Sequence, residues 1–85
     1  MYSVEISTKA FKALQSIPDP HKANIRQHID ELSYFSPNTP NVKLLSGNLA
    51  GHFRQRVGNY RIMFRLEVKR LVVTVIDVFH RGRAY

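Results

Sequence analysis

The order of apolar and polar positions predicts helices in the first half of the chain. Tyr2 to Ser7 alternates β-favouring and polar residues, as in a strand with one buried face. Ser7 can cap a first helix, whose apolar residues recur at helical spacing up to Ile17, just before Pro18. Asp19-Pro20, a cap followed by a first-turn proline, predicts a second helix that runs to about Ser33.

The second half predicts strands instead. Phe53–Val57 and Tyr60–Leu66 alternate on either side of Gly58-Asn59, and both of these residues accept the positive φ that a two-residue hairpin loop requires. Leu71–Phe79 is almost continuously apolar, as expected for a central strand buried on both faces. Between the two halves, Ser36–Asn41 is rich in turn residues and Lys43–Leu45 can begin a short extended stretch.

This order of elements, βααβββ, predicts an α+β fold. Two helices joined by so short a turn should run antiparallel and pack on one face of a small antiparallel sheet. At 85 residues the chain has the length of one small domain, so we expect residues 1–85 to form a single domain.

The hairpin loop predicts which side chains share a face. Counting outward from the loop places Val57 opposite Tyr60 and Arg56 opposite Arg61. One face then carries His52, Arg54, Arg56, Arg61, Met63 and Arg65, and the other carries Phe53, Gln55, Val57, Tyr60, Ile62, Phe64 and Leu66. Like charges opposite each other destabilise a sheet, and no Asp or Glu occurs between His52 and Leu66, so the arginines indicate function.

The net charge of +7 is confined to the second half. Residues 1–41 hold four basic and four acidic side chains, whereas residues 42–85 hold nine basic and two acidic ones. Seven of those nine are Arg, whose planar fork grips phosphate at two points, so a nucleic acid is the favoured partner. The alternative is a solvated basic surface with no partner.

The last six residues carry further chemistry. His80 is a candidate general acid or base, Arg81 and Arg83 are cations, and Tyr85 adds a phenol just past the last strand. Such a segment is typical of the edge of a site, although a frayed basic tail is the alternative.

These residues together resemble the RelE/ParE superfamily of bacterial and archaeal toxins, over nearly the whole chain. The resemblance rests on Lys43-Leu44, Gly47, the R-x-G-x-Y-R pattern of Arg56–Arg61, the His80-Arg81 pair after the last strand and the terminal Tyr85. RelE-like members cut messenger RNA in the ribosomal A site and are silenced by an antitoxin. ParE-like members instead poison DNA gyrase.

The resemblance implies the partners and site residues of a RelE-like toxin. The partners are a cognate antitoxin, mRNA in the ribosomal A site and 16S rRNA. The catalytic residues implied are Arg61, His80, Arg81 and Tyr85, and the RNA-binding residues implied are Lys43, His52, Arg54, Arg56, Arg65 and Arg83. In a ParE-like protein, the arginines would instead contact a protein or DNA and would not take part in a reaction.

Cleavage without a metal would use the RNA 2′-hydroxyl, which attacks its own phosphate in line. That step requires a base, a cation for the charge on the phosphorane, and an acid for the leaving oxygen. Either His80 or Tyr85 could be the base. Some relatives use a Glu on this face, and this hairpin has none.

Other classes of protein are not indicated. The four histidines have no metal-binding spacing and there is no Cys, so the sequence predicts neither a metal site nor a cofactor. No stretch reaches the roughly 18 apolar residues that a membrane span requires. The composition without Cys fits a reducing compartment, and we expect a cytoplasmic protein.

Overall fold

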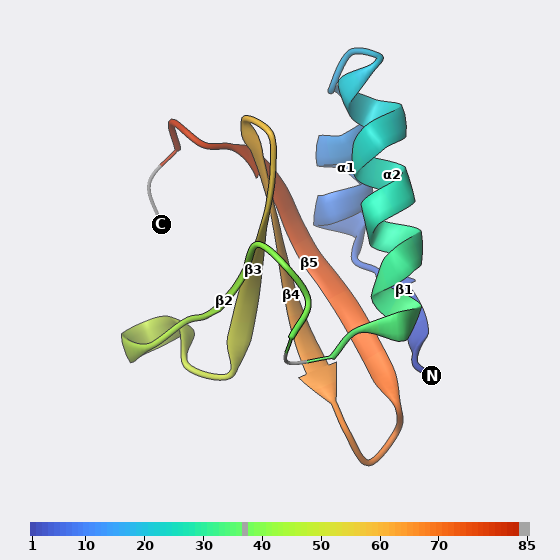
Figure 1. The fold of residues 1–85 in the computed structure, drawn as a ribbon. Helices are drawn as coiled ribbons and strands as arrows, with labels where there is room; N and C mark the ends of the chain where they lie inside the picture. Colours follow the sequence, from blue (N-terminus) through green and yellow to red (C-terminus); the bar gives the residue numbers. More distant parts are fainter. Residues whose placement is uncertain (37, 84–85) are drawn as a thin grey trace.

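The computed structural model describes residues 1–36 and 38–83. The elements follow in the order β1 (Ser3–Ile6), α1 (Thr8–Gln15), α2 (His21–Glu31), η1 (Leu32–Tyr34), β2 (Val42–Leu44), η2 (Gly47–Leu49), β3 (His52–Val57), β4 (Tyr60–Glu67) and β5 (Val72–His80), where η denotes a 3₁₀ turn. The five strands form one sheet in the order β1-β5-β4-β3-β2. Both helices lie on the same side of it and run in opposite directions, which confirms the predicted α+β class (Figure 1).

The sheet is mixed, so the predicted wholly antiparallel sheet is wrong at one position. β1 pairs parallel with β5, from Ser3 opposite Val72 to Ile6 opposite Val75. This pairing needs the whole intervening chain as its crossover, which local sequence does not reveal. The stretch predicted from Lys43 forms a fifth strand, β2, so the order is βααββββ. β2 has three residues and lies at the edge of the sheet.

The start of α1 is as predicted and the start of α2 is not. Ser7 Oγ accepts a hydrogen bond from the Ala10 N–H at 3.1 Å and donates one to the Ile76 carbonyl at 3.1 Å, so it joins α1 to β5. Asp19 does not cap α2. The N-cap is Pro20, without a side-chain bond, because the Pro18 carbonyl already accepts from the Lys22 N–H at 3.2 Å.

The core lies between the helices and the sheet. Its helical members include Leu14 of α1 and Ile25 and Ile29 of α2, all almost fully buried. The strands contribute Val57, Ile62, Phe64, Val73, Val75 and Val78. Burial of these side chains removes one face of the β3–β4 hairpin from solvent and leaves the other to the charged residues. Neither α1 nor α2, in the part of the chain that the structure describes, is long and apolar enough to cross a membrane.

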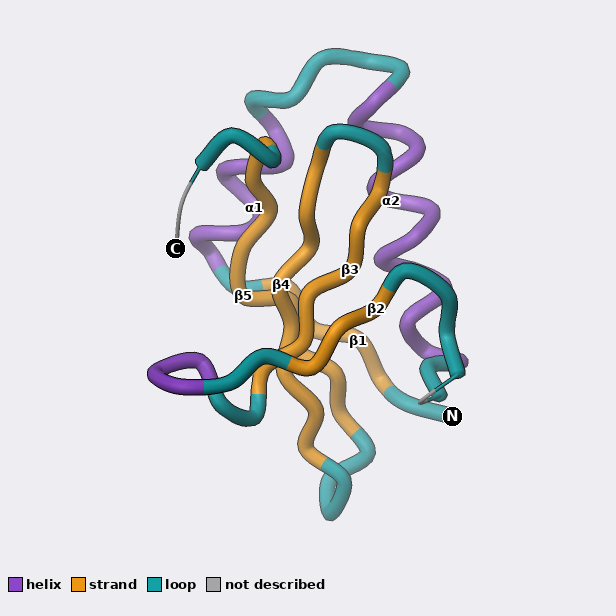
Figure 2. The backbone as a smooth tube through the Cα atoms, turned by 60° about the vertical axis from the view of Figure 1, so that its left-hand side comes forward, coloured by secondary structure: helices purple, strands orange, loops and turns teal. Residues whose placement is uncertain are grey.

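The two ends of the sheet differ in what they carry. The β3–β4 turn and the segment after β5 lie at one end, whereas the β4–β5 turn projects from the other (Figures 1 and 2). The hairpin loop and the C-terminal segment therefore meet at one end of the sheet.

Candidate functional site

The β3–β4 hairpin has the predicted register. Val57 is opposite Tyr60, Arg56 opposite Arg61 and His52 opposite Arg65. The turn differs in one detail, because only Gly58 takes a positive φ, of 58°, and Asn59 does not. A single glycine in the left-handed region is what this turn requires.

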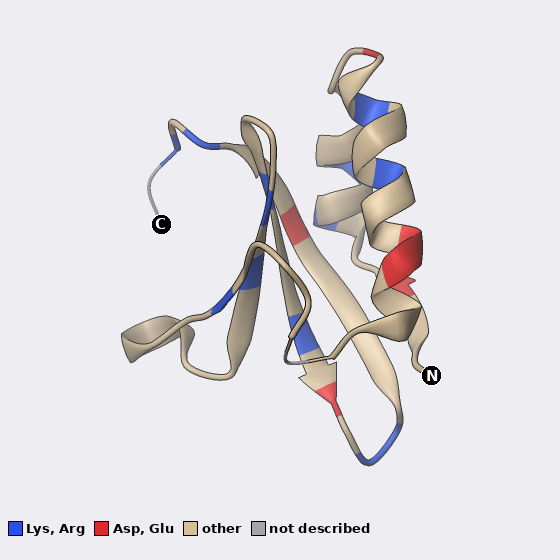
Figure 3. Cartoon of the chain, viewed as in Figure 1, with Lys and Arg blue, Asp and Glu red and all other residues tan. Residues whose placement is uncertain are grey.

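The face of the sheet away from the helices is basic, as the alternation predicted. Figure 3 shows basic positions on β2, β3 and β4 and in the segment after β5. Lys43 of β2 is directly opposite Arg54, so it extends the row across the sheet. The structure thus places Lys43, His52, Arg54, Arg56, Arg61 and Arg65 on one face, with His52 and Arg65 at its far end.

Arg61 is held within this group of cations. Its Nη1 donates to the carbonyls of Gly58 at 3.1 Å and Tyr60 at 2.9 Å. Partial burial, followed by the charges of Arg54, Arg56 and Arg81, lowers the pKa of Arg61. Those four side chains form the arginine cluster. A pKa lowered by like charges means that an anion bound here would relieve repulsion.

Two of the neighbours of Arg61 are also held in place. Arg56 Nη2 donates to Asn41 Oδ1 at 3.0 Å, and the Arg56 N–H donates to the Asn41 carbonyl at 2.9 Å. The Arg81 N–H donates to the Asn59 carbonyl at 2.8 Å, which joins the C-terminal segment to the hairpin loop. The cluster is therefore assembled from β3, β4 and the segment after β5, and hydrogen bonds hold the guanidinium groups of Arg56 and Arg61 before any partner binds.

His80 lies apart from the arginine cluster. It is opposite Tyr60, and the two rings meet edge to face at 5.4 Å between centroids, on the helix side of the sheet. His80 Nδ1 accepts from the Gly82 N–H at 3.2 Å. In the neutral ring the proton is therefore on Nε2, and His80 presents a hydrogen-bond donor there.

The helix side also holds an open cavity of about 320 Å³ between the end of α1 and the end of β5. Its walls include Ser16, Ile17, Tyr60, Phe79, His80 and Arg83. His21, at the start of α2, places its ring 5.5 Å from that of Tyr60. Residues 1–36 and 38–83 contain no group of three or more His, Asp or Glu that could hold a metal ion.

Residues 81–83 are held by hydrogen bonds to the hairpin loop and to His80, which argues against the frayed-tail alternative for these three residues. Arg83 was predicted to lie on an exposed tail as an RNA-binding cation. Its guanidinium instead donates to the buried carboxylate of Asp77 and lies 4.8 Å from the centre of the Phe79 ring. Tyr85, the remaining predicted catalytic residue, lies outside the described residues.

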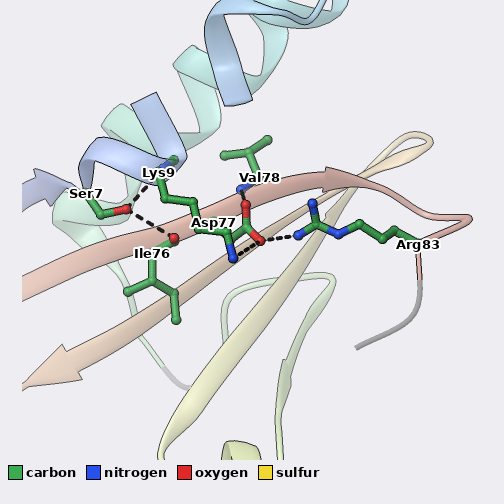
Figure 4. Close-up of polar contacts among 7 residues, drawn as sticks. Ser7, Lys9, Ile76, Asp77, Val78 and Arg83 are labelled. Carbon is green, nitrogen blue, oxygen red and sulfur yellow. Dashed lines mark hydrogen bonds and ion pairs between the residues drawn. The ribbon is translucent and has the colours of Figure 1, made fainter. Parts of the chain in front are cut away.

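Asp77 is the residue that sequence reasoning missed. It is 2% exposed and is opposite Met63, on the same face as the arginines, so that face does carry a carboxylate (Figure 4). The signal was a single acidic residue inside the apolar run Leu71–Phe79. A charge in a buried strand requires partners, and here Lys9 and Arg83 provide them.

Comparison with known proteins agrees with the fold. The family described as the ParE toxin of type II toxin–antitoxin systems, parDE, matches residues 4–85. No curated protein sequence matches the chain. The fold is similar to the toxin–antitoxin complex RelBE2 from Mycobacterium tuberculosis, with 30% identity, a TM-score of 0.82, and coverage of 94% of this chain and 98% of that one.

Two further structures are similar. The archaeal RelE–RelB complex from Pyrococcus horikoshii is 32% identical over 98% of each chain, with a TM-score of 0.78. The isolated RelE toxin from E. coli is 19% identical over 99% of this chain and 88% of that one, also with a TM-score of 0.78, and supports the fold alone. With a family match over almost the whole chain, this protein belongs to the RelE/ParE superfamily of type II toxin–antitoxin toxins.

Proposed function

We propose that this toxin is a ribosome-dependent, metal-independent endoribonuclease that cleaves mRNA in the ribosomal A site and so stops translation in the cytoplasm. The observation that carries the proposal is the arginine cluster, where Arg61, opposite Arg56, has a pKa lowered by burial and then by the charges of Arg54, Arg56 and Arg81. Such repulsion has no folding benefit, and a phosphate backbone laid across the cluster would relieve it.

The residues divide by role in this proposal. Arg61 and Arg81 stabilise the charge that develops on the scissile phosphate. Lys43, Arg54 and Arg56 hold the RNA backbone beside it. His52 and Arg65, at the far end of the same face, extend the contact to more distant RNA, including 16S rRNA.

Proton transfer is assigned to the C-terminal segment. In this proposal the scissile phosphate lies at the end of β5, between Arg81 and the helix-side ring of His80, whose Nε2–H in the neutral form donates a hydrogen bond to the leaving oxygen. We therefore assign the base to Tyr85, the other proton-transfer candidate in the sequence. Tyr85→Phe should lower single-turnover cleavage by about 10²–10⁴-fold, because it removes only the hydroxyl. A variant that cleaves at the wild-type rate would remove Tyr85 from the mechanism.

The antitoxin is the second proposed partner. The similar structures from M. tuberculosis and P. horikoshii are toxin–antitoxin complexes. We infer that a cognate antitoxin binds this chain and silences it. Co-expression with the adjacent gene, if one encodes the antitoxin, should restore growth.

The alternative from a different class is a ParE-like poison of DNA gyrase, and the matching family carries the name of ParE. Inducing the protein without antitoxin, followed by pulse labelling with amino acid and with thymidine, separates the two. We expect protein synthesis to stop first, with new mRNA 5′ ends at codon positions. Early loss of DNA synthesis with translation intact would establish gyrase poisoning instead.

Dependence on the ribosome and independence from metal are tested in vitro. Transcripts are offered free or on programmed ribosomes, and EDTA is added only after programming so that the ribosomes stay intact. Cleavage should persist in EDTA, because residues 1–36 and 38–83 include no cluster of three side chains that could hold a metal ion. It should require the ribosome, because the open basic face does not orient a flexible strand by itself. Equal cutting of free RNA would contradict the proposal.

A further inference from the structure

Asp77 is a buried acidic side chain that the proposed mechanism does not use. Its Oδ1 accepts from the Val78 N–H at 2.8 Å, and its Oδ2 contacts both Arg83 Nη2 and Lys9 Nζ, the latter at 3.4 Å (Figure 4). Lys9 belongs to α1 and Arg83 to the segment after β5. One carboxylate in β5 therefore contacts the start of the helical layer and the end of the described chain.

The two cations differ in what Asp77 does for them. Lys9 lies on α1, whose backbone is already ordered by its helix, and its side chain is 66% exposed. Arg83 lies on a segment without regular secondary structure, and its guanidinium is placed by Asp77 and by the Phe79 ring. Loss of the Asp77 carboxylate should therefore disturb the C-terminal segment more than it disturbs α1.

That segment is a tight turn built on His80. The Arg83 N–H donates to the His80 carbonyl at 3.0 Å, and the Gly82 N–H donates to His80 Nδ1 at 3.2 Å. Holding the Arg83 side chain holds the turn closed. The closed turn fixes the His80 tautomer, and it also fixes the direction in which the chain leaves the sheet at Arg81.

We propose that Asp77 is a positioning residue that fastens the His80–Arg83 turn to the sheet through Arg83, and thereby sets the places of His80 and Arg81. The effect on catalysis rests on the proposed function, whereas the effect on the turn does not. Asp77 itself touches no substrate in this scheme.

The first test needs no activity. Heteronuclear ¹⁵N NMR relaxation of the Gly82 and Arg83 amides is compared between wild type and Asp77→Asn, which keeps the shape and the acceptor for Val78. We expect fast motion of both amides in the variant. The matched control is Glu67→Gln, which breaks the exposed Glu67–Arg70 pair of 3.1 Å and should leave both amides rigid. Rigid Gly82 and Arg83 amides in Asp77→Asn would overturn the proposal.

The second test is a double-mutant cycle in single-turnover cleavage on saturating programmed ribosomes. Asp77→Asn and Arg83→Gln should each lower the rate by about 10–100-fold, as a displaced catalytic group does. The double variant should lose no more than either single variant, because both remove the same contact. Losses that multiply would overturn the pairing.

The cycle also separates positioning from RNA binding. If Arg83 acts through Asp77, the rate at saturation falls while the half-saturating ribosome concentration stays near its wild-type value. A raised half-saturation with an unchanged rate would make Arg83 an RNA-binding cation and overturn its positioning role. If Asp77→Asn does not fold, Arg83→Gln removes the same contact from a half-exposed side chain. If wild type fails to cleave, the proposed nuclease function falls, and the relaxation data alone decide the role of Asp77.

Discussion

At the scale of single residues, Arg61 is the most constrained cation of the site. Two backbone carbonyls hold one nitrogen of its guanidinium, and three other arginines lie close enough to lower its pKa. A side chain fixed in this way does not need to reorganise when negative charge develops near it. This is the property expected of a group that stabilises a transition state.

Arg61→Ala should therefore lower single-turnover cleavage by about 10²–10³-fold at saturating ribosomes. Arg70→Ala is the matched control, because Arg70 lies in the β4–β5 turn and pairs with Glu67. It should cleave at the wild-type rate. Circular dichroism checks that both variants fold, and near-wild-type cleavage by a folded Arg61→Ala would remove Arg61 from the site.

His80 allows a test of which ring nitrogen acts. The Nδ1 atom accepts from Gly82, so the Nε2–H is the group free to act on substrate. Gln places its amide nitrogen near the position of Nε2 and Asn places its own near Nδ1. His80→Gln should retain clearly more cleavage than His80→Asn, measured as single-turnover rates. The reverse order would assign the role to Nδ1.

At the scale of elements, β3 carries a polar residue on its core side. Gln55 is buried opposite Ile62 and Val42, and its Oε1 has no hydrogen-bond partner among the described residues. A buried carbonyl without a partner loses its hydration and gains nothing in return. The strand therefore holds this residue at a cost to stability.

Gln55→Met should raise the free energy of unfolding by about 1–2 kcal/mol, since it keeps the length of the side chain and removes the unpaired oxygen. Urea denaturation followed by circular dichroism measures the change. Gln27→Met, on the exposed face of α2, is the control and should change stability by less than about 0.5 kcal/mol. A lower midpoint for Gln55→Met would show that the amide makes a contact worth keeping.

At the scale of the whole molecule, the two halves of the chain become the two sides of the fold. The neutral first half supplies the helices, and the basic second half supplies the face opposite them. The basic residues of β2, β3 and β4 thus gather on one surface, which is the arrangement that steers a polyanion to a site.

This asymmetry predicts the salt dependence of binding. Arg54→Gln should reduce the slope of log affinity against log salt for ribosomal RNA by about 0.7, the value for one lost phosphate contact on a single strand. Lys12→Gln removes the same charge from α1, on the helix side, and should leave the slope unchanged. Filter binding at several salt concentrations gives both slopes. Equal reductions would mean that net charge, and not this face, drives binding.

The sequence by itself determined the features that depend on neighbouring residues. Successive side chains of a strand point to opposite faces, and Gly58-Asn59 forms a two-residue loop. Together these two features determine the register of β3 and β4, and hence which face carries the arginines. Ser7 was identified as a cap for the same local reason.

Tertiary structure alone decided the rest, because it depends on contacts between distant residues. The parallel pairing of β1 with β5 needs both ends of the chain. A register shift between Met63 and Phe64 leaves Ile76 of β5 without a partner residue on β4. This shift places Val75 in the core and Asp77 on the arginine side. In a continuously apolar run, either set of alternate side chains could face the core. Only the packing of the helices on β5 decides which set does. As a result, the Asp77 carboxylate lies where the Arg83 guanidinium can pair with it.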